Sequence, residues 1–446
     1  MAGQRLSRDG LQALARQRIH DRVLGCLFGA ALGDAIGLYT EFLSADIAAA
    51  CYPSRSFTLA PSSKATAFRR DAHRNPHQPG EWTDDTDHAL LIVLSYLHAN
   101  GAAVDPRDFA SRLHVWVRQG LRALDTLPMG LGRTVGSIVR NKDFLQDPEG
   151  TARHHWIVCS HRAAPNGSLM RTHPLGVICL DKTIEDTFQL AADFSVITHV
   201  DPRCIVSCAI GTALIRGILR HDVYAEAHID GIIDAAIEWY AGYRERQIAQ
   251  SPSRAEEPDL DLEELKRHTT VRQLADLRLD EARKIGYVYK TLGAGIHTLR
   301  LAMRVLHSTG GAMSSQLGLF ESLITDLVME AGDADTNAGF AGALLGSLLG
   351  FGVLPRHWRD GLRHGVWLLD KAEGLGALLG VGNVSYDGLE DKDTAPDGGR
   401  GFLTDKQIDT KVMKLQAWMV QEERKKTDLE SRTKKRDSHW LGWPWK

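Results

Sequence analysis

The stretch GDADTNAGFAGALLGSLLG, residues 332–350, joins two acidic residues to an almost wholly apolar helical pattern. Glycines recur in it every four residues, and they do so again in GCLFGAALGDAIG, residues 25–37. Residues spaced by four share one face of a helix, so each set forms a ridge without side chains. Each interior glycine costs about 1 kcal/mol relative to alanine, so two such ridges predict helix backbones packed closely around a central site. The glycines concerned are Gly25, Gly29, Gly33, Gly37, Gly342, Gly346 and Gly350.

Most of the remaining chain also predicts helices, because apolar residues recur at spacings of three and four between Gly and Pro breaks. The apolar segment 174–180 fits either a short strand or the start of a helix. We therefore expect an all-α fold, a compact multi-helix domain over residues 1–375. The expected helices cover 87–99, 107–124, 184–198, 202–220, 231–243, 283–306, 318–330, 336–350 and 355–371.

Two segments depart from this pattern. Residues 244–282 are charged and poor in aromatic residues, which predicts a mobile insertion within the domain. Residues 376–446 predict a tail made of a polar linker, a charged helix and the ending HWLGWPWK. Trp440, Trp443 and Trp445 lie beside basic residues and could contact RNA, a membrane or a protein. A disordered terminus is the simpler interpretation.

Composition restricts the classes of partner. The 446 residues include 53 basic and 56 acidic ones, a formal charge of −3, so no bulk charge favours nucleic acid or an anionic membrane. Six cysteines without a CxxC pair predict buried reduced thiols.

The longest apolar stretch, 338–354, is short and glycine-rich for a membrane span, and the N-terminus lacks the apolar core of a secretory signal. We expect no membrane span and a cytoplasmic or nuclear location.

The motif GEWTDDTD, residues 80–87, directly precedes an amphipathic helical run. Thr83 is suited to the N-cap position, and Asp84 and Asp85 fall in the first turn, where acids complement the helix dipole. Taken alone, the motif is explained by helix capping.

A second acidic motif changes that interpretation. AGDADTN, residues 331–337, precedes a helix so apolar that its start is expected to be buried. Buried carboxylates need a cation, hydrogen-bond donors or a proton. The two motifs offer four carboxylates and two hydroxyls without His or Cys, a donor set that favours Mg²⁺ or Mn²⁺ over zinc, and four carboxylates suit two ions. The predicted metal ligands are Thr83, Asp84, Asp85, Asp333, Asp335 and Thr336.

Several motifs in this order resemble the ADP-ribosylglycohydrolase superfamily over about residues 20–372. They are GCLFGAALGDAIG followed by Glu41, then GEWTDDTD, APNGSLMRTHPLGV, ITHVDP and GDADTNAGFAGALLGSLLG. The resemblance implies an all-helical fold with a binuclear Mg²⁺ or Mn²⁺ centre beside the distal ribose of ADP-ribose. Ala331, where a glycine is usual, and His88 depart from the family pattern.

The resemblance also implies substrate contacts. Glu41 matches a glutamate near the metals, although a solvated acid after a helix would look the same. His199 matches a substrate-side histidine that could equally be structural, and Arg171 and Asp34 match supports of the motif loops. Two further loops match substrate-contacting segments, and ordinary turns share their composition. Their residues are Gly130, Gly132, Asn166, Gly167 and Ser168.

The expected reaction is metal-dependent hydrolysis at C1″ of an α-linked ADP-ribose conjugate, with Asp84, Asp85 or Glu41 as the base. The substrate contains ADP-ribose, and an ADP-ribosylated protein is a possible partner. The leaving group remains open among arginine, serine, an acyl group and phosphate. A non-catalytic ADP-ribose-binding or structural relative is the alternative, although all six matching metal positions argue against it.

Overall fold

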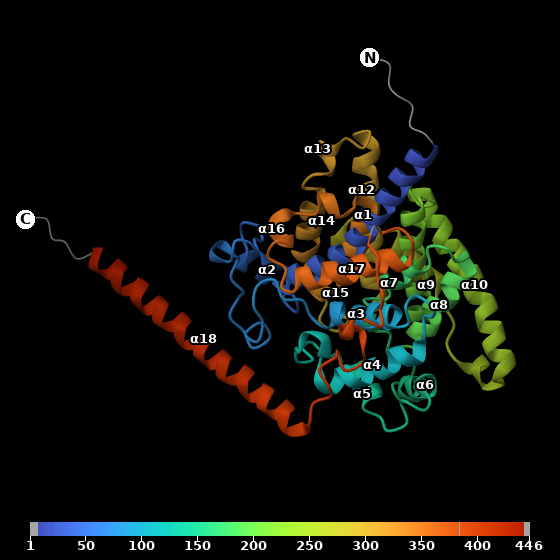
Figure 1. Ribbon diagram of the computed structural model, residues 1–446, viewed down its shortest axis with the longest axis horizontal. Coiled ribbons are helices and arrows are strands. Elements are labelled where there is room, and N and C mark those ends of the chain that lie inside the picture. The colour runs from blue at the N-terminus through green and yellow to red at the C-terminus, as the bar shows by residue number, and fades with distance from the viewer. Residues whose placement is uncertain (1–7, 383, 441–446) are drawn as a thin grey trace, which may run out of the picture.

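Helices build the whole architecture of the computed structural model, which describes residues 8–382 and 384–440 (Figure 1). Within these ranges there is no β-strand, and one isolated bridge joins Pro165 to Tyr287. The all-α prediction is confirmed. The helices are α1 (Arg8–Gly37), α2 (Ala45–Cys51), α3 (Asp84–His98), α4 (Pro106–Gln119), α5 (Arg133–Val139), α6 (Pro148–Val158), α7 (His173–Ile178), α8 (Ile184–Ser195), α9 (Pro202–Arg220), α10 (Glu226–Gln250), α11 (Leu262–Thr269), α12 (Val288–Ser308), α13 (Met313–Gln316), α14 (Leu319–Val328), α15 (Ala334–Leu349), α16 (Arg356–Arg359), α17 (Gly365–Leu378) and α18 (Asp405–Trp440).

Helices α1 and α15 form the central pair, and their glycine ridges face each other. A β-carbon added to Gly29 would lie less than 3.0 Å from the carbonyl oxygen of Gly342, and one added to Gly346 would lie equally close to the carbonyl of Gly25. Neighbouring β-carbons do not approach backbone atoms so closely, so only glycine permits this separation. The close packing expected from the glycine spacing is confirmed, and it runs along α1 to the start of α15.

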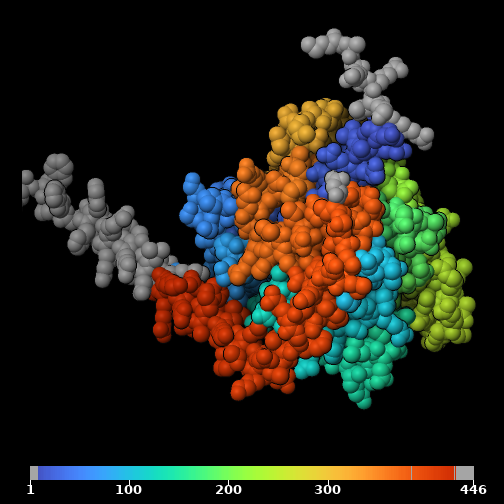
Figure 2. Space-filling model, in the orientation of Figure 1, coloured from blue at the N-terminus to red at the C-terminus, as the bar shows by residue number. Residues whose placement is uncertain are grey.

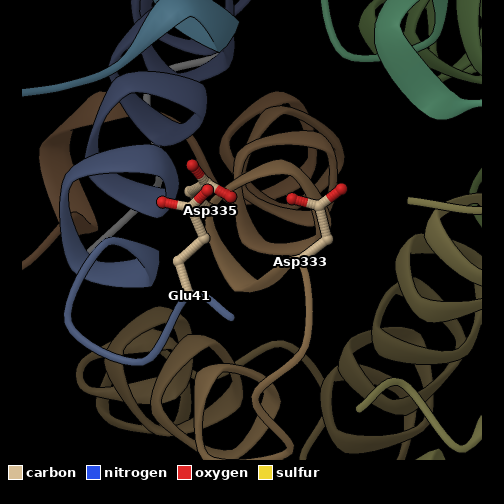
Figure 3. Close-up of side chains that lie close together, drawn as sticks. All are labelled: Glu41, Asp333 and Asp335. Atoms are coloured by element: carbon tan, nitrogen blue, oxygen red, sulfur yellow. The ribbon is translucent and has the colours of Figure 1, made fainter. Parts of the chain in front are cut away.

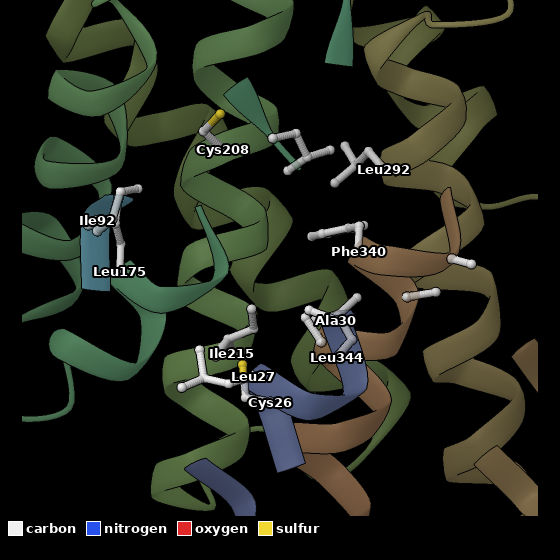
Figure 4. Packing of buried hydrophobic residues seen from close by; sticks show 14 of the residues in the cluster. Cys26, Leu27, Ala30, Ile92, Leu175, Cys208, Ile215, Leu292, Phe340 and Leu344 are labelled. Carbon is white, nitrogen blue, oxygen red and sulfur yellow. The ribbon is translucent and has the colours of Figure 1, made fainter. Parts of the chain in front are cut away.

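The hydrophobic core surrounds this pair. Phe340 of α15 fills the space left by Gly211 of α9 and Gly295 of α12, and Leu344 packs one turn further along (Figure 4). Helix α9 is the one described helix long and apolar enough to cross a membrane, and 89% of its most apolar window is buried inside the protein. Such burial is typical of a core helix of a globular protein.

All six cysteines are free thiols, four of them buried. Burial raises the pKa of the Cys26 thiol to about 12. The buried thiols therefore behave as small apolar side chains.

The structure decides one element that the sequence left open and corrects another. Residues 174–178 lie in a short helix, α7, and the segment 174–180 contains no strand. The helix expected over 355–371 is instead divided into α16 and α17, because His364 adopts a left-handed conformation with φ of 60°. A non-glycine residue in that region cannot continue a right-handed helix.

The insertion at 244–282 packs against the domain, unlike the mobile segment expected from its composition. Leu265 of α11 and the following Leu277 and Leu279 are buried. Arg153 of α6 forms an ion pair with Glu257 at 2.5 Å. Three buried leucines supply the apolar anchoring that the charge content of the segment conceals.

The chain after 375 is also partly anchored. Buried Lys371 of α17 forms an ion pair with Asp391 at 2.6 Å, and the Tyr386 hydroxyl donates to the same carboxylate at 2.7 Å. Beyond this, α18 projects from the body (Figure 1), and its described part is the red segment at the lower left of Figure 2. Trp443, Trp445 and the side chain of Trp440 lie outside the described residues.

Candidate active site

The two acidic motifs meet where the glycine seam ends. A β-carbon on Gly37, the last residue of α1, would lie less than 3.0 Å from the backbone of Asp335. Asp34, one turn earlier, accepts hydrogen bonds from the backbone amides of Thr83 and Thr86, both at 3.0 Å. Asp34 therefore caps the start of α3, in the supporting role expected for it, and fixes it beside the start of α15.

Thr83 occupies the N-cap position of α3, but its side chain caps no helix amide. Its hydroxyl lies 3.0 Å from Asp34, 3.3 Å from Asp335 and 3.4 Å from Asp85, measured to carboxylate oxygens. Helix capping alone does not explain this orientation, because an ordinary threonine N-cap accepts from the helix backbone. The hydroxyl instead faces the carboxylates of both motifs.

Five carboxylates gather in one cavity of about 800 Å³. Oxygens of Glu41, Asp333 and Asp335 lie within 4.8 Å of one another (Figure 3), and Asp84 and Asp85 line the same cavity. All five side chains are buried, and Asp85 Oδ1 has no hydrogen-bond partner in the part of the chain that the structure describes. No lysine or arginine in the described ranges forms an ion pair with them.

This concentration of negative charge changes the acidity of the site. Burial, followed by repulsion from Glu41, raises the pKa of Asp333 to about 6. Burial and neighbouring carboxylates also hold the pKa values of Asp84, Asp85 and Asp335 well above the usual range for aspartate. Ionising such a cluster is costly unless a cation compensates it. An orphaned buried oxygen and an all-oxygen donor set fit hard dications such as Mg²⁺ or Mn²⁺.

The third acid of the TDDTD motif lies away from this cluster. Both carboxylate oxygens of Asp87 accept indole N–H bonds, from Trp82 at 2.9 Å and from Trp116 at 2.8 Å. His88 is fully buried with its ring 4.3 Å from that of Trp116. These two residues therefore anchor α3 in the core.

The turn that carries Glu41 is held by two residues that the motifs did not reveal. His73 Nε2 lies 2.6 Å from the Glu41 carboxylate. Arg74 donates to the carbonyl oxygen of Tyr39 at 2.9 Å and also to that of Glu41. Both residues come from the irregular segment 65–80, whose sequence carries no recognisable signal for this role.

The NGS segment, residues 166–168, forms a short 3₁₀ turn beside Asp333. Asn166 Nδ2 donates to Asp333 Oδ2 at 2.9 Å, so the amide orients a carboxylate of the cluster as well as lining the cavity. Ser168, expected to contact substrate, is instead fully buried and does not line the cavity. Its hydroxyl is 3.1 Å from that of Ser195, because the turn directs it into the core.

A chain of hydrogen bonds orients His199. Arg171, fully buried, donates to the Thr198 hydroxyl at 2.9 Å, and that hydroxyl lies 2.7 Å from His199 Nδ1. His199 lines the cavity, and its Nε2 is buried and has no partner among the described residues. Burial, then the charge of Arg171, holds the pKa of His199 well below its usual value. A neutral imidazole with one free nitrogen can bond to a polar ligand.

Basic side chains line the cavity as well as the acidic cluster. Exposed Arg133, Arg162, Arg283 and Lys284 line it, and none of the three arginines forms an ion pair with a described residue. Gly130 and Gly132 lie on the loop before Arg133, with Gly130 directly against the Asp84 carboxylate. The cavity therefore offers groups suited to anions as well as groups suited to cations.

Most of the chain resembles known proteins of one family. A family model described as ADP-ribosylglycohydrolase matches residues 15–385. The chain is similar to ADP-ribosylarginine hydrolase Tri1 of Serratia proteamaculans, with 26% identity over 77% of this chain and 75% of that protein. It is also similar to ADP-ribosyl-[dinitrogen reductase] glycohydrolase of Rhodospirillum rubrum, with 23% identity over 76% of this chain and 90% of that protein. A solved chain titled ADP-ribosylglycohydrolase-related protein complex aligns at 22% identity and a TM-score of 0.48, covering 81% of this chain and 99% of that one.

Proposed function

The chain belongs to the ADP-ribosylglycohydrolase family, and from that membership we propose that it hydrolyses the C1″ bond of α-linked ADP-ribose conjugates with two Mg²⁺ or Mn²⁺ ions. It is a hydrolase of ADP-ribose conjugates, as its family and named relatives indicate. The observation that carries the finer proposal is the convergence of two acidic helix starts and Glu41 in one buried cluster that has no lysine or arginine partner among the described residues.

The proposed metal ligands are the residues of both motifs. Thr336 lines the cavity beside Asp335, and the Thr83 hydroxyl faces the same carboxylates. Bound dications would polarise a water and hold the ribose hydroxyls of the substrate. The proposed set is Thr83, Asp84, Asp85, Asp333, Asp335 and Thr336, with Glu41 beside it.

The protein groups proposed to act in hydrolysis are a carboxylate base and the residues that orient ADP-ribose. The water oxygen forms the new bond to C1″, the C1″ bond to the leaving group breaks, and its electron pair remains on the leaving atom, which takes a proton. Asp84, Asp85 and Glu41 are the candidate bases, because all three carboxylates line the cavity at the proposed metal site.

The charge distribution of the cavity gives the proposed orientation of the substrate. The diphosphate would lie toward the unpaired Arg133, Arg162 and Arg283, and the distal ribose toward the acidic cluster. His199 Nε2 would hydrogen-bond to the ligand.

The test is product analysis on a panel of conjugates with Mg²⁺, with Mn²⁺ and with EDTA. ADP-ribosyl-arginine, ADP-ribosyl-serine and O-acetyl-ADP-ribose are suitable substrates. We expect free ADP-ribose to appear from at least one of them and EDTA to abolish its release. Turnover that persists in EDTA would refute the metal mechanism, and ADP-ribose binding without any turnover would support the non-catalytic alternative.

A further inference from the structure

The Glu41 carboxylate lies among groups of its own charge. One of its oxygens is within 4.8 Å of an oxygen of Asp333 and of an oxygen of Asp335 (Figure 3). Like charges at such distances repel, and a glutamate side chain has other rotamers that would carry its carboxylate away. A further contact is therefore needed to keep Glu41 turned toward the cluster.

Among the described residues, one side chain bonds to this carboxylate. His73 Nε2 lies 2.6 Å from Glu41 Oε2. An ionised carboxylate only accepts hydrogen bonds, so His73 Nε2 carries the proton and donates it to the bond. Hydrogen bonds to charged acceptors are shorter and stronger than those between neutral groups. This bond opposes the repulsion within the cluster.

Other contacts hold the backbone of the turn, and they do not involve the imidazole. Arg74 donates to the carbonyl oxygen of Glu41, and the amide of Phe42 donates to the carbonyl oxygen of Gly332 at 2.6 Å. The His73 side chain is 31% exposed, whereas that of Glu41 is 7% exposed. Removing the imidazole should therefore release the carboxylate while the turn stays folded.

The fold also fixes the imidazole itself. Arg74, the next residue, forms an ion pair with Asp71 at 2.6 Å, which anchors the segment that carries His73. The centroid of the Phe42 ring lies 4.9 Å from that of His73. Phe42 has a φ of 58°, a strained conformation for a bulky residue, and such strain clusters at functional sites. Its side chain is 54% exposed, so this ring contact lies outside the hydrophobic core.

We propose that His73 is a positioning residue for hydrolysis, which holds the Glu41 carboxylate at the cavity in the orientation that the reaction uses. The inference rests on the proposed function, in which Glu41 is a candidate base. Without the bond Glu41 would occupy several rotamers, and a catalytic group displaced by about 1 Å costs roughly 100-fold in rate. The hydrogen bonds of Asn166 and His199 do not involve His73, so kcat should change more than KM.

The kinetic test compares His73→Gln with His73→Phe. Glutamine keeps an N–H donor with a reach similar to that of Nε2, whereas phenylalanine keeps an aromatic ring against Phe42 and cannot donate. On the best conjugate we expect His73→Phe to lower kcat roughly 10- to 100-fold with KM changed less than about threefold, and His73→Gln to stay within about threefold of the wild-type kcat. A role in packing alone predicts the opposite order. Equal kcat values in the two variants, or a higher kcat in His73→Phe, would overturn the proposal.

Crystal structures of the wild type and both variants separate this proposal from the proposed function, because they need no turnover. In the wild type and His73→Gln we expect Glu41 to keep an oxygen within 4.8 Å of the Asp333 and Asp335 carboxylates, and in His73→Phe we expect it to turn away. If the wild type hydrolysed no conjugate, the proposed function would fail, and the structures would still show whether His73 holds Glu41. A Glu41 side chain that stays in place in His73→Phe would reject that role.

Discussion

Replacing Gly37 by alanine should damage catalysis far more than the equivalent change at Gly25, although both belong to the same seam. In each case the new β-carbon would lie less than 3.0 Å from backbone atoms of the opposing chain segment. At Gly25 those atoms belong to Gly346 and Gly350, and at Gly37 they belong to Ala334 and Asp335. Twelve residues of helix separate the two sites by about 18 Å.

The magnitude follows from the separation that the new atom requires. Non-bonded heavy atoms pack at about 3.5–4.0 Å, so the opposing backbones must move apart by about 1 Å. Overpacking of this kind costs about 1–3 kcal/mol, and the better helix propensity of alanine offsets up to about 1 kcal/mol of it. A displacement of about 1 Å in a catalytic group costs roughly 100-fold in rate. We therefore expect Gly37→Ala to lower kcat about 100-fold and Gly25→Ala to change it little.

The assay pairs steady-state hydrolysis of the best conjugate with thermal denaturation of both variants. Similar falls in melting temperature with a loss of kcat confined to Gly37→Ala would support the reasoning. Equal losses of kcat in the two variants would mean that the seam affects activity only through the stability of the fold. Wild-type melting temperatures in both variants would contradict the claim that only glycine fits there.

Three further predictions concern the ligands, the metals and the tail. Asp335→Ala should lower kcat by orders of magnitude, whereas His199→Ala should chiefly raise KM, as steady-state kinetics on the same conjugate would reveal. Mg²⁺ or Mn²⁺ at a hundredfold excess over its dissociation constant should stabilise the wild type by about 2.7 kcal/mol, and a melting temperature unmoved by either ion would contradict the site. Deleting 405–446 should leave hydrolysis nearly unchanged. Deleting 376–446 should lower the melting temperature, because it leaves the buried Lys371 without Asp391. Equal melting temperatures for this deletion and the wild type would contradict that anchoring.

The elements that the sequence predicted well are those with a local repeat. Apolar spacing predicted most helices, and glycine spacing predicted the α1–α15 seam. The broken helix at His364 and the anchored insertion were missed, because a left-handed residue and three scattered leucines leave no periodic signal. The acidic motifs were recognisable because their residue types imply a shared chemistry even at a distance in the chain.

The sequence by itself determined the helical class, the two glycine ridges and the acidic helix starts, since each depends on residues within a few turns of one another. Only the tertiary structure decided how these parts meet. It directed the Thr83 hydroxyl toward the carboxylates, buried Ser168, and joined His73 to Glu41. It also left the Phe42 ring exposed at the cavity. Those outcomes depend on contacts between segments far apart in the chain, and side-chain direction at such contacts is set by packing, which no local pattern encodes.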